Sequence, residues 1–138
     1  ATIFEKIVEK KGSVPTLIHP SANVSKYAQL GRGVVVHMNT VVHPDVTVGD
    51  NTVLSYNVSV THSTHIGKNC YLAFGVMLGA YTIVEDFVFI GIGAIVISGK
   101  VDSIGTFASI GAGAVVTKSV ASYECVAGNP AKFIKTLK

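Results

Sequence analysis

The amino-acid sequence predicts an all-β chain folded as a parallel β-helix of six-residue repeats, with three strands per coil and a short helix at each end. Two observations predict it. Aliphatic residues recur at every sixth position over most of the chain, and small or β-branched residues recur two positions before them. Glycine also follows the aliphatic position in many repeats, where it is expected to supply backbone freedom at a tight turn. One domain accounts for all 138 residues.

Residues 1–15 are predicted to form a helix and a linker. Ile3, Phe4, Ile7 and Val8 follow one another at helical spacing, so one face of this segment is apolar. The open end of a repeat stack exposes unpaired strand edges, which need cover. We therefore expect the helix to cap the first coil.

The β-helix is predicted to span residues 16–117. Its aliphatic positions are Ile18, Val24, Leu30, Val36, Val42, Val48, Leu54, Val60, Ile66, Leu72, Leu78, Val84, Ile90 and Val96. Two inward positions separated by one outward residue are typical of a short strand, and the other three residues of each repeat must turn. Residues eighteen apart then stack at the spacing of neighbouring strands, about 4.8 Å.

The phase of the repeat slips once, between Val96 and Ile104, which indicates a two-residue insertion in the segment SGKVDS. The repeat resumes at Ile110 and Val116. Residues 118–138 are predicted to form a C-terminal loop and a helix that covers the last coil with apolar side chains. Those side chains are Phe133, Ile134 and Leu137.

The composition narrows the classes of function. A net charge of +3 is too small and too dispersed for a nucleic-acid partner, but it suits an anionic small molecule. No apolar run is long enough to cross a membrane, and the mixed segment ATIFEKIVEK does not resemble a secretory signal, so we expect a cytoplasmic protein with no membrane partner. Cys70 and Cys125 form neither a disulfide framework nor a metal motif.

Several motifs resemble a known family. The hexads VGDNTV, IGKNCY and IGAGAV and the ending VAGNPAK at 126–132 resemble the hexapeptide-repeat acyltransferases. The stretches TLIHPSA at 16–22 and SVTHSTHIG at 59–67 are similar to the bacterial nucleotide-sugar N-acetyltransferases and the sialic acid O-acetyltransferases. The resemblance covers residues 16–132. It implies left-handed coils, acetyl-CoA as the co-substrate and a nucleotide-linked sugar as the acceptor, and no metal.

The resemblance implies that His62 is the general base, because a histidine follows the repeat valine by two residues in those relatives. An imidazole titrates near neutral pH and can accept a proton from an attacking amine or hydroxyl. Ser63 stands where the relatives carry Asp or Glu, so either its hydroxyl or a carboxylate from elsewhere is expected to orient the ring. The alternative is a solvated histidine at a corner of the coil.

The resemblance also implies an acetyl-CoA site. Gly79 and Ala80, on the coil after His62, are expected to offer backbone N–H donors to the thioester oxygen. Further acetyl-CoA contacts are expected from Ser98, Gly111, Ala112, Gly113 and Lys132, with Lys118 and Lys135 as other candidates near the phosphates. Cys70 occupies an inward position and is expected to pack in the core, not to carry an acyl group.

Substrate contacts are expected from His43, Ser55 and Tyr71, the last two replacing an asparagine and a histidine of the relatives. These replacements leave the acceptor open, and we favour a sugar amine over a hydroxyl because a neutral amine is already a good nucleophile. A zinc site like that of the related γ-carbonic anhydrases is not expected, since no two histidines have H-x4-H spacing. A non-catalytic β-helix scaffold is the alternative of another class.

The resemblance and the outward side chains lead to two expectations about the whole molecule. Such relatives carry an N-terminal nucleotide-binding subdomain, so residues 1–15 are interpreted as a possible remnant of it. A cluster of outward apolar residues predicts a homotrimer in which His62 of one subunit lies near the CoA site of the next. These residues are Tyr71, Phe74, Met77, Tyr81, Phe87 and Phe89.

Overall fold

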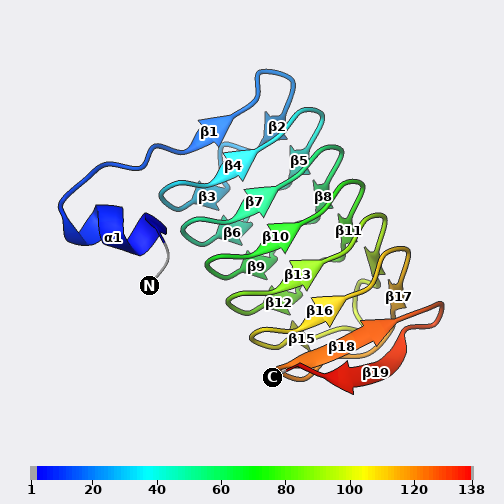
Figure 1. Ribbon diagram of the computed structural model, residues 1–138. Coiled ribbons are helices and arrows are strands. Elements are labelled where there is room, and N and C mark those ends of the chain that lie inside the picture. The colour runs from blue at the N-terminus through cyan, green and yellow to red at the C-terminus, as the bar shows by residue number, and fades with distance from the viewer. Residues whose placement is uncertain (1–2, 138) are drawn as a thin grey trace.

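The computed structural model describes residues 3–137 and confirms the left-handed parallel β-helix of hexapeptide repeats (Figure 1). A helix, α1 (Ile3–Glu9), precedes three sheets that form the sides of the coil. Sheet A contains β1 (Leu17–Ile18), β4 (Val35–Val36), β7 (Val53–Leu54), β10 (Tyr71–Leu72), β13 (Phe89–Ile90), β16 (Ser109–Ile110), β18 (Glu124–Ala127) and β19 (Lys132–Thr136). Sheet B contains β2 (Asn23–Val24), β5 (Val41–Val42), β8 (Ser59–Val60), β11 (Met77–Leu78), β14 (Ile95–Val96) and β17 (Val115–Val116). Sheet C contains β3 (Gln29–Leu30), β6 (Thr47–Val48), β9 (His65–Ile66), β12 (Ile83–Val84) and β15 (Ser103–Ile104).

The core is the interior of the coil, and it follows the predicted period. In the middle coils the second residue of each strand is buried, as Leu54 and Leu72 are, and so is the residue two positions before it. Several of these earlier residues are threonines, whose hydroxyls donate to backbone carbonyls inside the coil. Thr40 Oγ1 bonds Ser55 O at 2.6 Å, and Thr52 Oγ1 bonds Gly67 O at 2.8 Å. The threonines therefore fill core positions without leaving a polar group unpaired.

The glycines after the aliphatic positions serve a purpose different from the one expected. Positive φ occurs three residues after the aliphatic position, for example at Asn51 (56°) and Gly93 (65°), and not at Gly49. A Cβ on Gly49 would lie 2.6 Å from the carbonyl carbon of Gly67 on the next coil. The expectation of backbone freedom at these glycines is therefore wrong. Close approach of successive coils requires them.

The insertion lies where the phase slip placed it. Strands β12 and β15 pair with Ile83 opposite Ser103, twenty residues apart instead of eighteen. The additional segment keeps Val101 buried against the core. The coil therefore absorbs the two residues at one corner and continues in register through β16 and β17.

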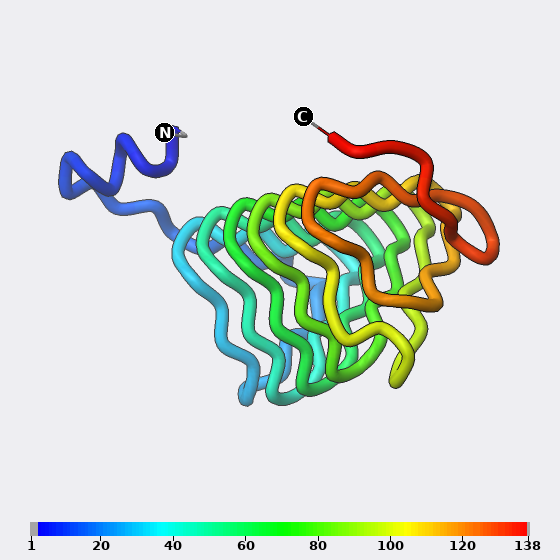
Figure 2. Tube along the Cα trace, turned by 90° about the horizontal axis from the view of Figure 1, so that it is seen from below, coloured from blue at the N-terminus to red at the C-terminus, as the bar shows by residue number. Residues whose placement is uncertain are grey.

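Both ends of the coil differ from the prediction. Helix α1 forms, but it stands to the side of the first coils (Figure 2), so Leu17 and Ile18 remain 58% and 48% exposed. At the other end, the predicted C-terminal helix is wrong. Strand β18 pairs with β16, and β19 pairs antiparallel with β18. The open edge of sheet A offers hydrogen bonds that an added strand satisfies, and this outweighs the helical spacing of the apolar residues. Within residues 3–137, no helix has the length and apolar character needed to cross a membrane.

Candidate active site

His62 lies at the corner where the chain passes from sheet B to sheet C, which we call corner B–C. It follows the buried Val60 by two residues, and register places the equivalent residues of the next three coils beside it. We call this row the His62 column; it consists of His62, Ala80, Ser98 and Lys118. The sequence predicted the stacking of Ala80 on His62. The continuation to Lys118 depends on the two-residue insertion, which β14 and β17 absorb in register.

The ring of His62 is exposed and has two neighbours. Its Nδ1 atom lies 3.4 Å from Ser63 Oγ, so the hydroxyl that replaces the expected carboxylate is close enough to influence the ring. Tyr81, on the following coil, meets the imidazole edge to face, with 5.3 Å between ring centroids and 87° between planes. The sequence did not point to this second contact. The one sign of this contact in the sequence is that Tyr81 stands eighteen residues after Ser63 and so stacks on it.

A shallow groove runs over sheet B and reaches corner B–C beside His62. Its floor is apolar, and its rim toward the corner carries Thr61, Gly79 and Ser98. The remaining lining residues are Ser59, Met77, Leu78, Ile95, Val96 and Ile97. An extended chain with apolar and amide groups fits such a surface, because the groove offers apolar contact along its length and polar contact at its rim.

Neither of the two backbone N–H groups expected to face the thioester is free. Gly79 N donates to Val96 O at 3.0 Å within the ladder of coils. Ala80 N donates to Ser98 Oγ at 3.0 Å. The expectation that these amides stand open as donors is therefore wrong for this structure. The structure instead joins Ala80 and Ser98 into one hydrogen-bonded unit on the His62 column.

Two lysines line one groove at the far end of the column. Lys118 and Lys132 line one groove beside the C-terminal hairpin, together with Ser119, Glu124 and Phe133. Three coil spacings of about 4.8 Å separate Lys118 from His62 along the column, roughly 14 Å in all. Gly111, Ala112 and Gly113 lie at a different corner, between sheets A and B, where Gly111 packs on Ala127 of the hairpin.

The three expected substrate residues do not converge within one chain. His43 lies at corner B–C one coil before His62, and its N–H donates to Val60 O. Ser55 is buried at the corner between sheets A and B, which removes it from the exposed surface that a substrate could reach. Tyr71 lies on the outer face of sheet A, stacked on Phe89 at 5.9 Å. Only His43 therefore lies near His62 in this chain.

Cys70 and His65, which could have served as a nucleophile and a metal ligand, have structural roles instead. Cys70 is almost fully buried, and burial raises the pKa of its thiol to about 11, so it remains protonated and shielded. His65 lies outward on sheet C, where its Nδ1 atom bonds Thr47 Oγ1 at 2.6 Å. In the described part of the chain, no group of three or more histidine, cysteine or acidic side chains is arranged to hold a metal ion.

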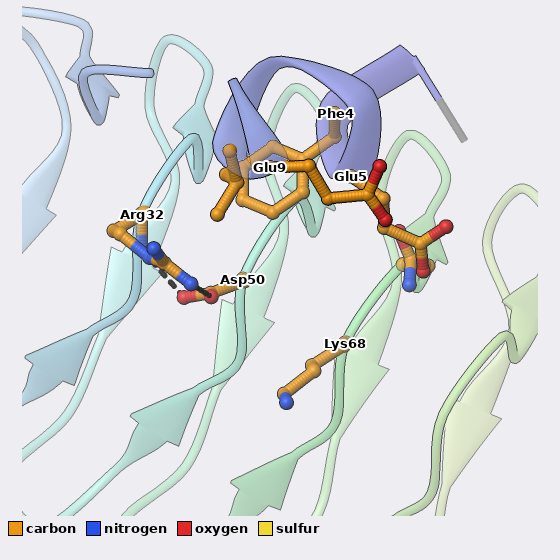
Figure 3. A pocket seen from close by; sticks show the side chains of 8 residues that line it. Phe4, Glu5, Glu9, Arg32, Asp50 and Lys68 are labelled. Carbon is orange, nitrogen blue, oxygen red and sulfur yellow. Dashed lines mark hydrogen bonds and ion pairs between the residues drawn. The ribbon is translucent and has the colours of Figure 1, made fainter. Parts of the chain in front are cut away.

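A second pocket lies between α1 and the corner that joins sheet C to sheet A (Figure 3). Arg32 and Asp50 form an ion pair of 2.7 Å on its floor, while Glu5 and Glu9 come from the helix and Lys68 from the next coil. Burial alone would raise the pKa of Asp50, but hydrogen bonds from Arg32 and the charges of Arg32 and Lys68 together lower it. The lining mixes two basic side chains with three acidic ones, so the pocket offers no site of a single sign for an ion.

Comparison with known proteins agrees with the resemblance seen in the sequence. Residues 27–62 match the family described as bacterial transferase hexapeptide (six repeats). Within this range the chain carries the repeat that the family model describes. The chain is similar to the acetyltransferase domain of PglB from Neisseria gonorrhoeae, which was solved with acetyl coenzyme A. The two are 30% identical over 96% of this chain and 63% of that one, with a TM-score of 0.91.

Two further solved structures are similar over the same part of the hexapeptide-repeat chain. One is a histidine-to-alanine mutant of GDP-perosamine N-acetyl transferase from Caulobacter crescentus, with CoA and GDP-perosamine, at 29% identity over 96% of this chain and 62% of that one (TM-score 0.79). The other is WeeI from Acinetobacter baumannii, at 26% identity over 96% of this chain and 64% of that one (TM-score 0.90). The chain thus spans somewhat less than two thirds of the length of these structures. No curated protein matches it by sequence.

Proposed function

We propose that the protein is an acetyl-CoA-dependent acetyltransferase that acts on the amino group of a nucleotide-linked sugar, with His62 as the general base. The observation that carries the proposal is the His62 column. It begins at an exposed imidazole, follows the rim of an apolar groove and ends about 14 Å away at Lys118, which lines a second groove together with Lys132. A thioester near His62, a pantetheine arm in the groove and CoA phosphates at Lys118 and Lys132 would use these features in order. The similarity to sugar acetyltransferases solved with acetyl-CoA and CoA supports the same assignment.

The proposed reaction is a direct transfer. The sugar amine attacks the thioester carbon, His62 takes the proton that the nitrogen loses, and the C–S bond breaks to release the CoA thiolate, which is then protonated. A covalent acyl-enzyme through Cys70 does not fit, because this thiol is buried and protonated. The N-acetyltransferase similarity favours an amine acceptor over the hydroxyl of sialic acid or another sugar.

We further propose that the active protein is a homotrimer that works in the cytoplasm. The outward apolar residues of the sequence prediction lie on several faces, but four exposed apolar side chains form one row at the corner between sheets A and B. They are Met38, Tyr56, Phe74 and Ile92, 41–56% exposed. Burying this row against two further copies would bring sheet B of each subunit beside its neighbour. Tyr71, on sheet A, and His62, at corner B–C, lie on different sides of one chain. In this arrangement Tyr71 would therefore reach only the His62 of another subunit. The two free thiols fit a reducing compartment.

Replacement of His62 tests the function. His62→Ala is expected to lower turnover of acetyl-CoA with UDP- or dTDP-4-amino sugars by about two to four powers of ten, the scale of a lost general base, with little change in CoA affinity. His19→Ala, an exposed histidine on the first coil, serves as the matched control and should keep full activity. Unchanged turnover in His62→Ala would remove His62 from the mechanism. Activity with sialic acids alone would overturn the amine acceptor, and calorimetry that detects no acetyl-CoA binding would favour a scaffold.

A further inference from the structure

We propose that the hydroxyl group of Ser98, not the backbone N–H of Ala80, donates the hydrogen bond that stabilises the thioester oxyanion. This proposal rests on the acetyltransfer proposed above. The two residues are neighbours on the His62 column, and the contact between them decides which group faces the groove. Ala80 is 5% exposed and its N–H points into Ser98 Oγ at 3.0 Å, whereas Ser98 itself is exposed.

The same type of contact occurs elsewhere in the coil, and the comparison shows what is particular about Ser98. At the corner between sheets C and A, Arg32 N donates to Asp50 Oδ1 and Lys68 N donates to Asp86 Oδ1, each at 2.7 Å. In each case a side chain on the next coil accepts a hydrogen bond from a backbone N–H that has no partner in the ladder between the coils. An ionised carboxylate can only accept, but a hydroxyl that accepts one hydrogen bond still has a proton to donate.

Ser98 lies at the groove and keeps a hydroxyl proton that it can donate. Ser98 lines the groove beside Gly79, and among the described residues its hydroxyl accepts from Ala80 N–H and has no protein acceptor for its own proton. Thr61, the other hydroxyl of the rim, already donates to Leu78 O. Because Ser98 Oγ reaches back to Ala80 N, it lies at the level of the coil next to His62. Ser59 also lines the groove, on the outer face of β8, but Ser98 is the serine of the groove that lies on the His62 column.

This arrangement suits the chemistry of acetyl transfer. When the amine attacks, the C=O π electrons move to oxygen, and the negative charge needs a donor fixed in place before the reaction. The Ser98 O–H can bond that oxygen while its own oxygen accepts from Ala80 N–H, and such a chain of hydrogen bonds is stronger than its separate links. When the C–S bond breaks, the carbonyl re-forms and the bond to Ser98 weakens again. No proton leaves Ser98 in this cycle.

The test uses a signal from the thioester itself. Acetyl-CoA labelled with 13C at the carbonyl is bound to the full chain, and its NMR shift is compared with that of free acetyl-CoA. A hydrogen bond from Ser98 moves the bound resonance downfield, and Ser98→Ala should abolish this movement. The variant should also lower kcat about 100- to 1000-fold, the usual effect of losing one oxyanion donor, with a much smaller change in KM. Ser98→Thr, which keeps the hydroxyl, should restore both.

The matched control is Ser25→Ala. Ser25 Oγ accepts the N–H of Tyr27 at 3.2 Å at the same corner but on the first coil, so its loss removes a similar bond far from His62. If Ser98→Ala keeps the bound shift, or if kcat stays equal or rises because Ala80 N–H becomes free, Ser98 is not the donor. If the wild-type chain binds no acetyl-CoA, the acetyltransferase function itself fails and this proposal fails with it.

Discussion

At the scale of single residues, Tyr81 has a backbone conformation that its side chain does not favour. Its φ is 61°, a region that costs most L-residues about 1 kcal/mol or more. Three aromatic residues at the corner between sheets C and A also have positive φ: Phe87, Phe107 and Tyr123. Their rings stack on one another, and this stacking offsets the cost of the backbone conformation. Tyr81 stands between Ser63 and Gly99 in its row, and its ring partner is His62. We interpret Tyr81 as a residue that positions the imidazole.

Tyr81→Asn separates stability from activity. Asparagine tolerates positive φ, so the free energy of unfolding should rise by about 0.5–1 kcal/mol in urea titrations. Loss of the ring contact, typically about 0.5–1.5 kcal/mol, should lower kcat/KM by up to roughly ten-fold. Tyr81→Phe keeps the ring and should keep activity within about two-fold. An Asn variant with wild-type kcat/KM would contradict the positioning role.

At the scale of the elements, each coil turns through corners that place two different demands on its residues. One position needs positive φ, which glycine or asparagine can adopt. Another, at glycines such as Gly49, leaves no room for a Cβ, because the backbone of the next coil passes close by. The two demands look alike in the sequence, since glycine meets both, and the structure separates them.

A pair of substitutions measures this difference. Gly93 has a φ of 65° and open space where a Cβ would lie, so Gly93→Asn should change the free energy of unfolding by less than about 1 kcal/mol. Gly49→Asn has to push its neighbour Gly67 away, and overpacking of this kind costs about 1–3 kcal/mol or more. Urea unfolding of both variants compares them directly. Equal losses of stability would refute the distinction.

Opposite charges alternate along the corner between sheets C and A, at Arg32, Asp50, Lys68 and Asp86. Because the pKa of Asp50 is lowered in the folded chain, its contribution to stability is present above its ordinary pKa of 3.8 and is lost as pH falls through the lower folded value. Asp50→Asn should therefore lower the free energy of unfolding at pH 7, by at most about 1 kcal/mol for a surface pair. The difference from wild type should shrink below pH 3.8. A constant difference in stability from pH 7 to pH 2 would exclude the ion pair as its cause.

At the scale of the whole molecule, the apolar row at the corner between sheets A and B is the feature that predicts assembly. Phe74→Lys places a charge in the middle of this row, where burial against another subunit would leave it unpaired. Light scattering should report three times the chain mass for the wild type and a smaller mass for the variant. Ile83→Lys, an exposed apolar residue on sheet C, is the control and should leave the mass unchanged. A wild-type monomer that is stable and active would refute both the trimer and the shared site.

The sequence by itself determined the coil. Its period of six and the inward aliphatic positions such as Leu54 and Leu72 repeat many times, so each coil confirms the others. The insertion between Val96 and Ile104 occurs once and is visible as a slip against that period. It also placed His62 at an outward corner with Ala80 beside it. These predictions succeed because a repeat fold converts spacing along the chain directly into neighbours in space.

The tertiary structure decided whatever depends on a particular contact. The helical spacing of Phe133 and Ile134 gave way to strand β19 because the end of the stack offered an open edge to pair with. The buried position of Ser55, the ring of Tyr81 against His62 and the capture of Ala80 N–H by Ser98 depend on side-chain direction. Spacing shows which residues stack, but the competition among hydrogen-bond donors and acceptors at each corner is resolved only when the coils lie against one another.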